Sequence, residues 1–140
     1  MRTVLGFVML AALTIPAQAH DGQLAGAKNA KVTPVYRHAL PGVPGKSLKG
    51  VVVDYGPGGY SPSHRHAKSA IIYATVLEGT VKCELNGGPI KVYRAGENWT
   101  ELPGDHHGVS ANASETKSAK LLAVFVVDDA DTELTIPDGG

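Results

Sequence analysis

The sequence predicts an all-β fold, either a sandwich or a small barrel. Short runs rich in Val, Ile, Tyr and Leu recur along the chain, and glycine- and proline-rich turns separate them. Beyond residue 19, no window shows the 3.6-residue repeat of an amphipathic helix. Many short strands at nearly regular spacing with such corners are typical of sandwiches and barrels. With 13 acidic and 13 basic residues among 140, the chain fits one domain and offers no charge excess for nucleic acid or an anionic membrane.

The first segment, residues 1–19, is predicted to be a secretory signal peptide. Arg2 gives it a positive start, residues 4–15 are apolar, and Ala17-Gln18-Ala19 is a small-residue cleavage motif. The apolar stretch is too short to span a bilayer, and a buried N-terminal helix is the alternative. We therefore expect cleavage after Ala19, a periplasmic or secreted protein, and no membrane span in the mature form.

The next segment, residues 20–46, is a predicted N-terminal arm in which only residues 32–38 resemble a strand. Pro34 confines that strand to a sheet edge, because proline cannot donate a ladder hydrogen bond. Beyond the arm the β pattern is clear, and five strands are predicted at residues 48–55, 70–77, 80–85, 90–93 and 120–127. Residues 47–128 thus form the predicted domain, and the polar residues 129–140 form a predicted solvent-exposed tail.

Two of the predicted strands differ in their expected surroundings. Residues 121–127 are apolar on both faces, which indicates a strand in the middle of a closed structure. Residues 80–85 alternate, so one of their faces is expected to meet water or the rim. Cys83 lies in this alternation and is the single cysteine, so no internal disulfide is available. We expect it to be a small inward-facing apolar residue rather than a nucleophile.

The candidate functional residues are histidines in two separate segments. His64 and His66 stand two positions apart, and about forty residues later His106 and His107 are adjacent. In an extended strand, residues i and i+2 project from the same face about 7 Å apart. Two imidazoles placed in this way can converge on one ion, which then needs a third ligand from elsewhere. The residues alone leave either His106 or His107 as that ligand.

The two histidine segments resemble the two motifs of the cupin family. The first family motif is matched by Gly58, His64-Arg65-His66 and Gly79. The second is matched by Gly96, Pro103-Gly104-Asp105-His106-His107 and Asn112. The resemblance covers residues 51–127 and implies a single-domain double-stranded β-helix, or jelly-roll barrel. It also implies that His107 is the third ligand with His106 turned away, and that the protein is a homodimer to which the N-terminal arm contributes.

The chain departs from the cupin pattern at one position. The family usually places a glutamate four residues after the second histidine, as a fourth ligand, and here that residue is Ala70. What remains, His64, His66 and His107, resembles the three-histidine site of some cupin dioxygenases. Three neutral imidazoles leave the charge of a divalent ion uncompensated, which favours an anionic substrate. Imidazole ligands do not discriminate among Fe, Zn, Cu and Ni, so the metal stays open, and a site that has lost its metal is the alternative.

Other side chains are expected around this site. Glu101 and His106 are candidates for contacting the ligand histidines, with a solvated strand residue as the alternative for Glu101. Alternate residues of the predicted strand at 70–77 are expected to point inward, so the residues that line the pocket should be Ala70, Ile72, Ala74 and Val76. Tyr73 is expected at the mouth of the pocket or packed between sheets or subunits.

These features predict an exported metal-binding cupin that holds one divalent transition metal and a small-molecule ligand. The expected activity is that of an oxidoreductase, in the manner of a dioxygenase, acting on a small organic anion. A barrel that binds a small molecule or a metal without turnover is the first alternative, so enzymatic activity itself is left open. A structural cupin that serves through its dimer interface is the second.

Overall fold

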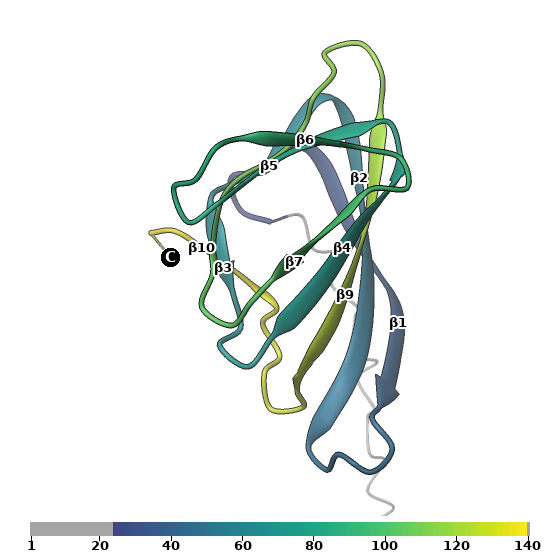
Figure 1. Ribbon diagram of the computed structural model, residues 1–140, viewed down its shortest axis with the longest axis vertical. Coiled ribbons are helices and arrows are strands. Elements are labelled where there is room, and N and C mark those ends of the chain that lie inside the picture. The colour runs from purple at the N-terminus through teal and green to yellow at the C-terminus, as the bar shows by residue number, and fades with distance from the viewer. Residues whose placement is uncertain (1–23, 140) are drawn as a thin grey trace, which may run out of the picture.

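The Val-, Ile- and Tyr-rich runs form β-strands in the computed structural model, which describes residues 24–139. These residues contain no helix, and so none that is long and apolar enough for a bilayer crossing. The all-β prediction is confirmed (Figure 1). The signal peptide expected at residues 1–19 lies outside the described part of the chain. In chain order the strands are β1 (Lys28–Ala39), β2 (Lys46–Ser61), β3 (His64–His66), β4 (Ile71–Glu78), β5 (Thr80–Leu85), β6 (Lys91–Arg94), β7 (Asn98–Glu101), β8 (His106–Asn112), β9 (Ala119–Asp128) and β10 (Thr135–Pro137).

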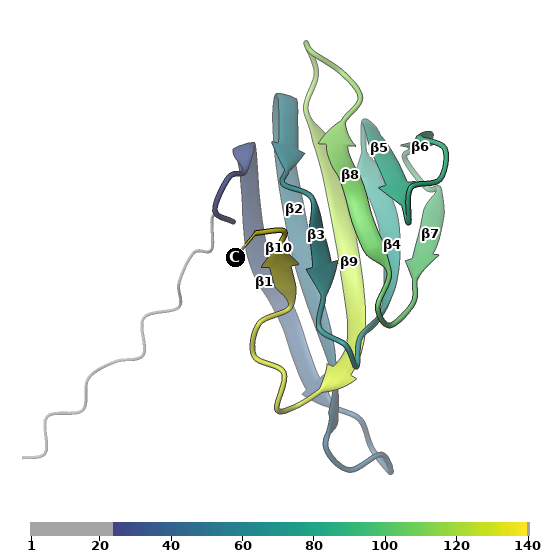
Figure 2. The ribbon, with the colours of Figure 1, turned by 90° about the vertical axis from the view of Figure 1, so that its left-hand side faces the viewer.

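The strands form two layers that enclose an interior (Figures 1 and 2). One layer runs β1-β2-β9-β4-β7, the other runs β10-β3-β8-β5-β6, and the pairings are antiparallel. Most neighbouring strands are not consecutive in sequence, as in a jelly roll. β2 joins the layers, because residues 46–55 pair with β9 whereas Tyr60 and Ser61 pair with β8. The predicted double-stranded β-helix is confirmed as a nearly closed barrel.

The glycine- and proline-rich residues 56–59 follow the strand predicted at 48–55, but they form a bend inside β2 rather than its end. β2 continues past this corner because Tyr60 still pairs with β1. Gly58 has a φ of 62°, a conformation that costs glycine no strain. A side chain at Gly59 would collide with the main-chain oxygen of Asn29, so the close approach of β1 requires glycine there. The bend turns the end of β2 into the second layer, beside β8.

The core lies between the layers and is built largely on β4 and β9. Alternate residues of these two strands face inward and are buried, namely Ile72, Ala74, Val76, Leu121, Ala123, Phe125 and Val127. β9 lies between β2 and β4, as expected of a strand that is apolar on both faces. Cys83 is buried in the same core, and burial raises the pKa of its thiol to about 12. The thiol therefore stays protonated, which fits the expected packing role.

Both ends of the described chain pair with strands of the same domain. β1 lies at the edge of its layer, with a register shift between Pro34 and Tyr36 where proline cannot join the ladder. The expectation of a solvent-exposed tail at residues 129–140 is wrong at β10, which pairs with β3, and Leu134 packs against the core just before it. A three-residue strand held by main-chain hydrogen bonds needs no apolar alternation, so composition gave no sign of it.

Candidate metal centre

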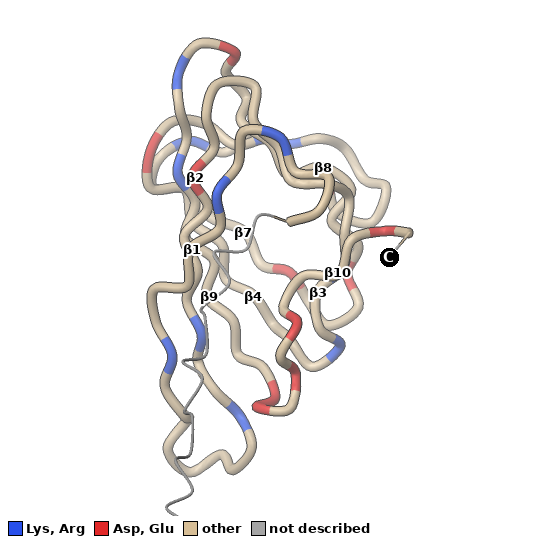
Figure 3. The backbone as a smooth tube through the Cα atoms, turned by 180° about the vertical axis from the view of Figure 1, so that it is seen from behind, with Lys and Arg blue, Asp and Glu red and all other residues tan. Residues whose placement is uncertain are grey.

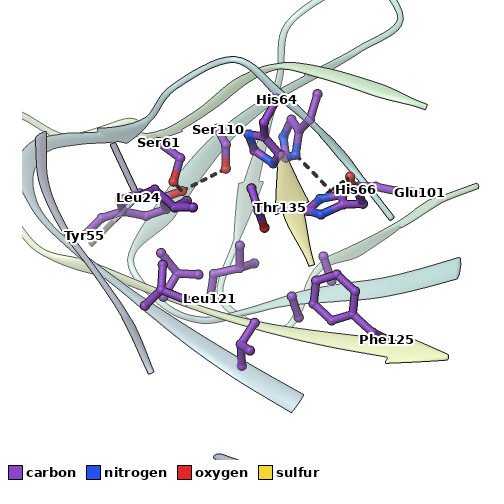
Figure 4. Close-up of a pocket in the computed structure, with 16 residues that line it drawn as sticks. Leu24, Tyr55, Ser61, His64, His66, Glu101, Ser110, Leu121, Phe125 and Thr135 are labelled. Atoms are coloured by element: carbon purple, nitrogen blue, oxygen red, sulfur yellow. Dashed lines mark hydrogen bonds and ion pairs between the residues drawn. The ribbon is translucent and has the colours of Figure 1, made fainter. Parts of the chain in front are cut away.

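Three imidazoles meet on two neighbouring strands. His64 and His66 project from the same face of β3, and His107 of β8 lies directly opposite His64 in the antiparallel ladder. The ring centroid of His64 is 4.8 Å from that of His66 and 5.0 Å from that of His107. One nitrogen of each ring lies within 4.8 Å of the corresponding atoms of the other two. The ladder thus gathers the three rings predicted from the motifs around one point, where Figure 4 shows His64 and His66.

Main-chain oxygens hold two of these rings at their Nδ1 atoms. Nδ1 of His64 lies 2.7 Å from the carbonyl oxygen of Pro62, and Nδ1 of His66 lies 2.8 Å from that of Leu134. Because a carbonyl oxygen only accepts, each Nδ1 carries the proton, and each Nε2 is left with a lone pair. Burial, reinforced by His66, lowers the pKa of His64 to about 4, so this ring is neutral at pH 7. With Nδ1 held by a carbonyl group, each of the two rings directs Nε2 toward a metal.

Glu101, the last residue of β7, is buried beside the rings of His66 and His107. Its Oε1 atom accepts a hydrogen bond from Nε1 of Trp99 at 3.0 Å and lies 3.2 Å from Nδ1 of His107. Its Oε2 atom lies 3.1 Å from Nε2 of His66. Burial acts to raise the pKa of this carboxyl, but the contacts with His107 and His66 outweigh it and hold the pKa below its usual range. The structure therefore places an anionic carboxylate among the histidines.

Two buried atoms at this point have no hydrogen-bond partner among residues 24–139. They are Nε2 of His107 and Oε2 of Glu101. A buried polar atom without a partner costs about 1–3 kcal/mol, and more when it is charged. Both residues line the same cavity and both atoms can offer a lone pair, so a cation in the cavity can satisfy them where a second acceptor could not. The donor set of imidazole nitrogens and a carboxylate oxygen therefore fits a divalent transition metal.

His106 lies on the outer side of β8, away from the other three rings. Its Nε2 atom lies 2.8 Å from Oγ of Ser63 and 2.6 Å from Oδ2 of Asp138. The main-chain N–H of Asp138 also donates to the carbonyl oxygen of Ser63. The suggested contact of His106 with the ligand histidines is therefore not made, because strand parity turns adjacent residues to opposite faces. Instead His106 ties the C-terminal segment to the start of β3.

The loop between β9 and β10 fixes the carbonyl group that holds His66. Acidic residues gather along this loop (Figure 3). Asp128 forms an ion pair with Lys46, and Oδ2 of Asp131 accepts a hydrogen bond of 2.6 Å from Oγ of Ser69. The acidic residues that suggested a solvated tail therefore anchor the segment that leads to Leu134.

A cavity of about 50 Å³ lies beside the histidines. Its apolar wall includes Val51, Val53, Ala74, Leu121, Ala123 and Phe125. Ala74 is thus a lining residue, as expected from the parity of β4.

The other pocket residues expected on or next to β4 lie elsewhere. Ala70, Ile72 and Val76 are buried but do not line this cavity. The cavity is lined instead by Phe125 and Leu121 of β9, which pair with Ile72 and Val76. Tyr73 is 46% exposed on the outer face, because alternate residues of β4 point away from the interior.

A cluster of hydroxyl groups forms a second polar end of the cavity. The phenol oxygen of Tyr55 lies 2.8 Å from Oγ of Ser61 and 2.8 Å from Oγ of Ser110. Figure 4 shows this cluster across the cavity from His66 and Glu101. Burial raises the pKa of Tyr55, so the phenol stays protonated. Sequence analysis missed this cluster. Tyr55 is separated by even numbers of residues from Val51 and Val53, which would have placed its side chain on the same inward face of the strand.

Comparisons with known proteins identify a sequence family that matches this chain and solved structures with a similar fold. The sequence model of the Cupin domain family matches residues 51–125. A search of curated protein sequences finds no significant match. The cupin domain of Cnp3 from Schizosaccharomyces pombe superposes with a TM-score of 0.58 at 14% identity, over 74% of this chain and 68% of that chain. KdgF from Halomonas sp. superposes with a TM-score of 0.56 at 16% identity, over 74% of this chain and 83% of that one.

An oxalate oxidase solved in complex with glycolate is also similar in structure. The TM-score is 0.59 at 22% identity, over 78% of this chain, which spans 55% of the length of the oxidase chain. At these identities the structural likeness concerns the fold alone. The family match, however, covers more than half of the 140 residues and includes both histidine motifs. The protein is therefore a member of the cupin family.

Proposed function

We propose that this cupin binds one divalent transition metal through His64, His66 and His107 and acts as an oxidoreductase, in the manner of a dioxygenase, on a small organic anion. The observation that carries the proposal is the arrangement of three inward imidazoles, of which His64 and His66 have their Nδ1 protons held by carbonyl groups. A bound ion of this kind supplies Lewis acidity and, if it is redox-active, access to oxygen chemistry.

The cavity supports a small substrate. One water needs roughly 10–15 Å³ of this kind of volume, so a cavity of about 50 Å³ holds only a few non-hydrogen atoms. The hydroxyl groups of Tyr55, Ser61 and Ser110 share two hydrogen bonds, so one of their three protons is left to donate to an oxygen atom of such a molecule, and the apolar wall excludes water. An oxalate oxidase of the same fold binds glycolate, an anion of this size. A short carboxylate is therefore the substrate class that we put first.

The metal proposal is tested by the metal content of protein purified without a histidine tag. We expect close to one equivalent of a transition metal per wild-type chain, and loss of that metal in His64→Ala and in His107→Ala. His106→Ala is the matched control, because this ring lies on the outer side of β8, and it should keep the metal. Unchanged metal content in His107→Ala would contradict the ligand assignment.

Turnover is tested separately by oxygen uptake. The wild-type protein loaded with iron, manganese or copper is presented with oxalate, glycolate, diketones, thiols and catechols. Oxygen consumption that is lost in His64→Ala supports an oxidoreductase. Tight binding of one of these compounds without oxygen consumption by any metal form supports the binding module instead.

We also propose that residues 1–19 are removed on export and that the mature protein is periplasmic or secreted. The charged start, apolar stretch and small-residue motif of this segment support the proposal. N-terminal sequencing of the protein from culture supernatant and periplasmic extract should begin at His20. A full-length chain confined to the cytoplasm would contradict it.

Finally, we propose that the protein is a homodimer. The outer face of β4 exposes an apolar row, with Ile71 41%, Tyr73 46% and Leu77 44% exposed. This row continues onto the outward residues of β9, since Ile71 and Tyr73 pair with Val126 and Val124. In analytical ultracentrifugation we expect a dimer for the wild type and a monomer for Tyr73→Glu, with Leu102→Glu as a control at another exposed apolar position. A monomeric wild type at micromolar concentration would contradict the proposal.

A further inference from the structure

The position of Glu101 is not explained by its hydrogen bonds alone. Its Oε1 atom has two partners, the N–H of Trp99 and Nδ1 of His107, whereas its Oε2 atom is buried without one. Oε2 instead faces Nε2 of His66 at 3.1 Å. Nδ1 of His66 donates its proton to the carbonyl group of Leu134, so Nε2 is the ring atom left to bind a metal. A ring nitrogen and a carboxylate oxygen held at this distance need a positive charge between them, which either a proton on Nε2 or a metal ion bound to both atoms supplies.

The cupin motif provides a second reason. The chain lacks the usual glutamate of the first motif and has the buried Ala70 in its place. β7 pairs with β4 so that Glu101 lies opposite Ile72, two residues beyond Ala70. A carboxylate is therefore delivered to the histidines from the second half of the barrel, although the first motif has lost its own. Trp99 fixes Oε1 and so determines the direction in which Oε2 points.

We propose that Glu101 is the fourth protein ligand of the metal, through Oε2, and that its Oε1 atom holds the ligand His107. This inference rests on the proposed three-histidine site and extends it to a site of three imidazoles and one carboxylate. The carboxylate reduces the net charge of a divalent ion and its protein ligands from 2+ to 1+. One substrate carboxylate then neutralises the centre, which narrows the proposed substrate class to monoanions and to anions that bind through one charged group.

The test compares Glu101→Gln with wild type in binding of Zn²⁺ and Co²⁺ to the metal-free protein. Glutamine keeps the size of the side chain and an oxygen that accepts from Trp99, but it removes the charge. We expect the Kd for Zn²⁺ to rise by at least about 100-fold. Removing a residue that only hydrogen-bonds to a metal ligand typically raises the Kd by about 10–100-fold. We also expect a changed visible absorption spectrum of the Co²⁺ form, because the charged oxygen leaves the first coordination shell.

Glu84→Gln is the matched control, since Glu84 also has a buried carboxylate oxygen without a partner and is not among the residues around the histidines. It should leave both measurements unchanged. Glu101→Asp, which keeps the charge on a shorter side chain, should recover part of the affinity. For each variant the metal-induced rise in Tm is measured against its own metal-free form, so a change in the stability of the apo fold does not obscure the result.

The outcomes separate this inference from the one on which it rests. A wild-type protein that binds neither metal overturns the three-histidine proposal itself. A Glu101→Gln variant with the wild-type Co²⁺ spectrum overturns only the ligand role of Glu101, whether or not the affinity falls, and reduces it to a residue that positions His107. A changed spectrum together with the expected loss of affinity supports the four-ligand site.

Discussion

The two polar ends of the cavity differ in how their hydrogen bonds are completed. At the hydroxyl end, Tyr55, Ser61 and Ser110 bond to one another. At the imidazole end, Nε2 of His107 and Oε2 of Glu101 are buried without partners. A buried polar group that is satisfied stabilises a fold, whereas one that is not lowers stability until something binds it. The comparison teaches that every hydroxyl oxygen at one end of the cavity has a partner within the protein, whereas the other end leaves two buried atoms for a ligand.

The largest expected effect comes from removing the metal at the imidazole end. A ligand present at about 1,000 times its Kd stabilises the folded state by about 4 kcal/mol, or roughly 10–15 °C in Tm for a domain of this size. A chelator should therefore lower the Tm of the wild type by about that amount and leave His107→Ala unchanged. Differential scanning calorimetry measures this. An equal drop in His107→Ala would mean that the metal stabilises the protein from another place.

The pH dependence of the metal-free protein is the next largest effect. The pKa of His64 is about 4 in the folded protein, against its ordinary value of 6.5, because the ring is buried. Between these values the unfolded chain binds a proton that the native state excludes. The stability from this residue is therefore complete above about pH 6.5 and is lost as the pH falls toward 4, a change of order 3 kcal/mol.

Urea unfolding between pH 7 and pH 4, with chelator present, measures this change. The pKa of Glu101 is also lowered in the folded protein, so protonation of the unfolded chain below the ordinary pKa of 4.5 lowers the free energy of unfolding further. We expect His64→Gln to flatten the profile between pH 6.5 and pH 4, and His38→Gln, at an exposed position, to follow the wild type. A wild-type stability that rises on acidification would show that the imidazole end does not exclude protons.

A smaller effect is expected at the hydroxyl end. Tyr55→Phe removes the phenol oxygen and leaves two buried serine hydroxyls with one partner fewer, at a cost of about 1–3 kcal/mol. Metal affinity should not change, because the hydrogen bonds of the Tyr55 phenol go to Ser61 and Ser110 and not to a histidine. Tyr60→Phe is the control, at a tyrosine outside the proposed dimer face that is 41% exposed, and should change stability by less than about 0.5 kcal/mol. A loss of metal binding in Tyr55→Phe would abolish the distinction between the two ends.

The smallest effect is expected where the C-terminal segment is tied down. Ser63→Ala removes the hydroxyl that contacts His106 and Asp138. The main-chain ladder between β10 and β3 remains, so the carbonyl group of Leu134 should stay near His66. We expect metal affinity to fall by less than about tenfold, which is less than the loss typical when a residue that hydrogen-bonds directly to a metal ligand is removed. Hydrogen exchange of the β10 amides should become faster, and unchanged exchange would show that the tie does not hold the strand.

Much of the architecture could be predicted because it depends on local pattern. The strands at 70–77, 80–85 and 120–127 were expected within a residue or two of β4, β5 and β9, since apolar runs and turn residues mark them. The two histidine motifs identified His64, His66 and His107, which the structure brings together. Tyr73 and the tail were misjudged because the outward face of a strand and a short edge strand leave little trace in composition.

The sequence by itself determined the all-β class and the central strands, because apolar runs and turn residues mark them, and its two cupin motifs pointed to His64, His66 and His107. Only the tertiary structure decided the rest of the site. The carbonyl group of Leu134 reaches His66 through the pairing of β10 with β3, and Glu101 reaches the same rings through the pairing of β7 with β4. A main-chain oxygen has no residue signature, and the partner of a buried carboxylate depends on which strands become neighbours.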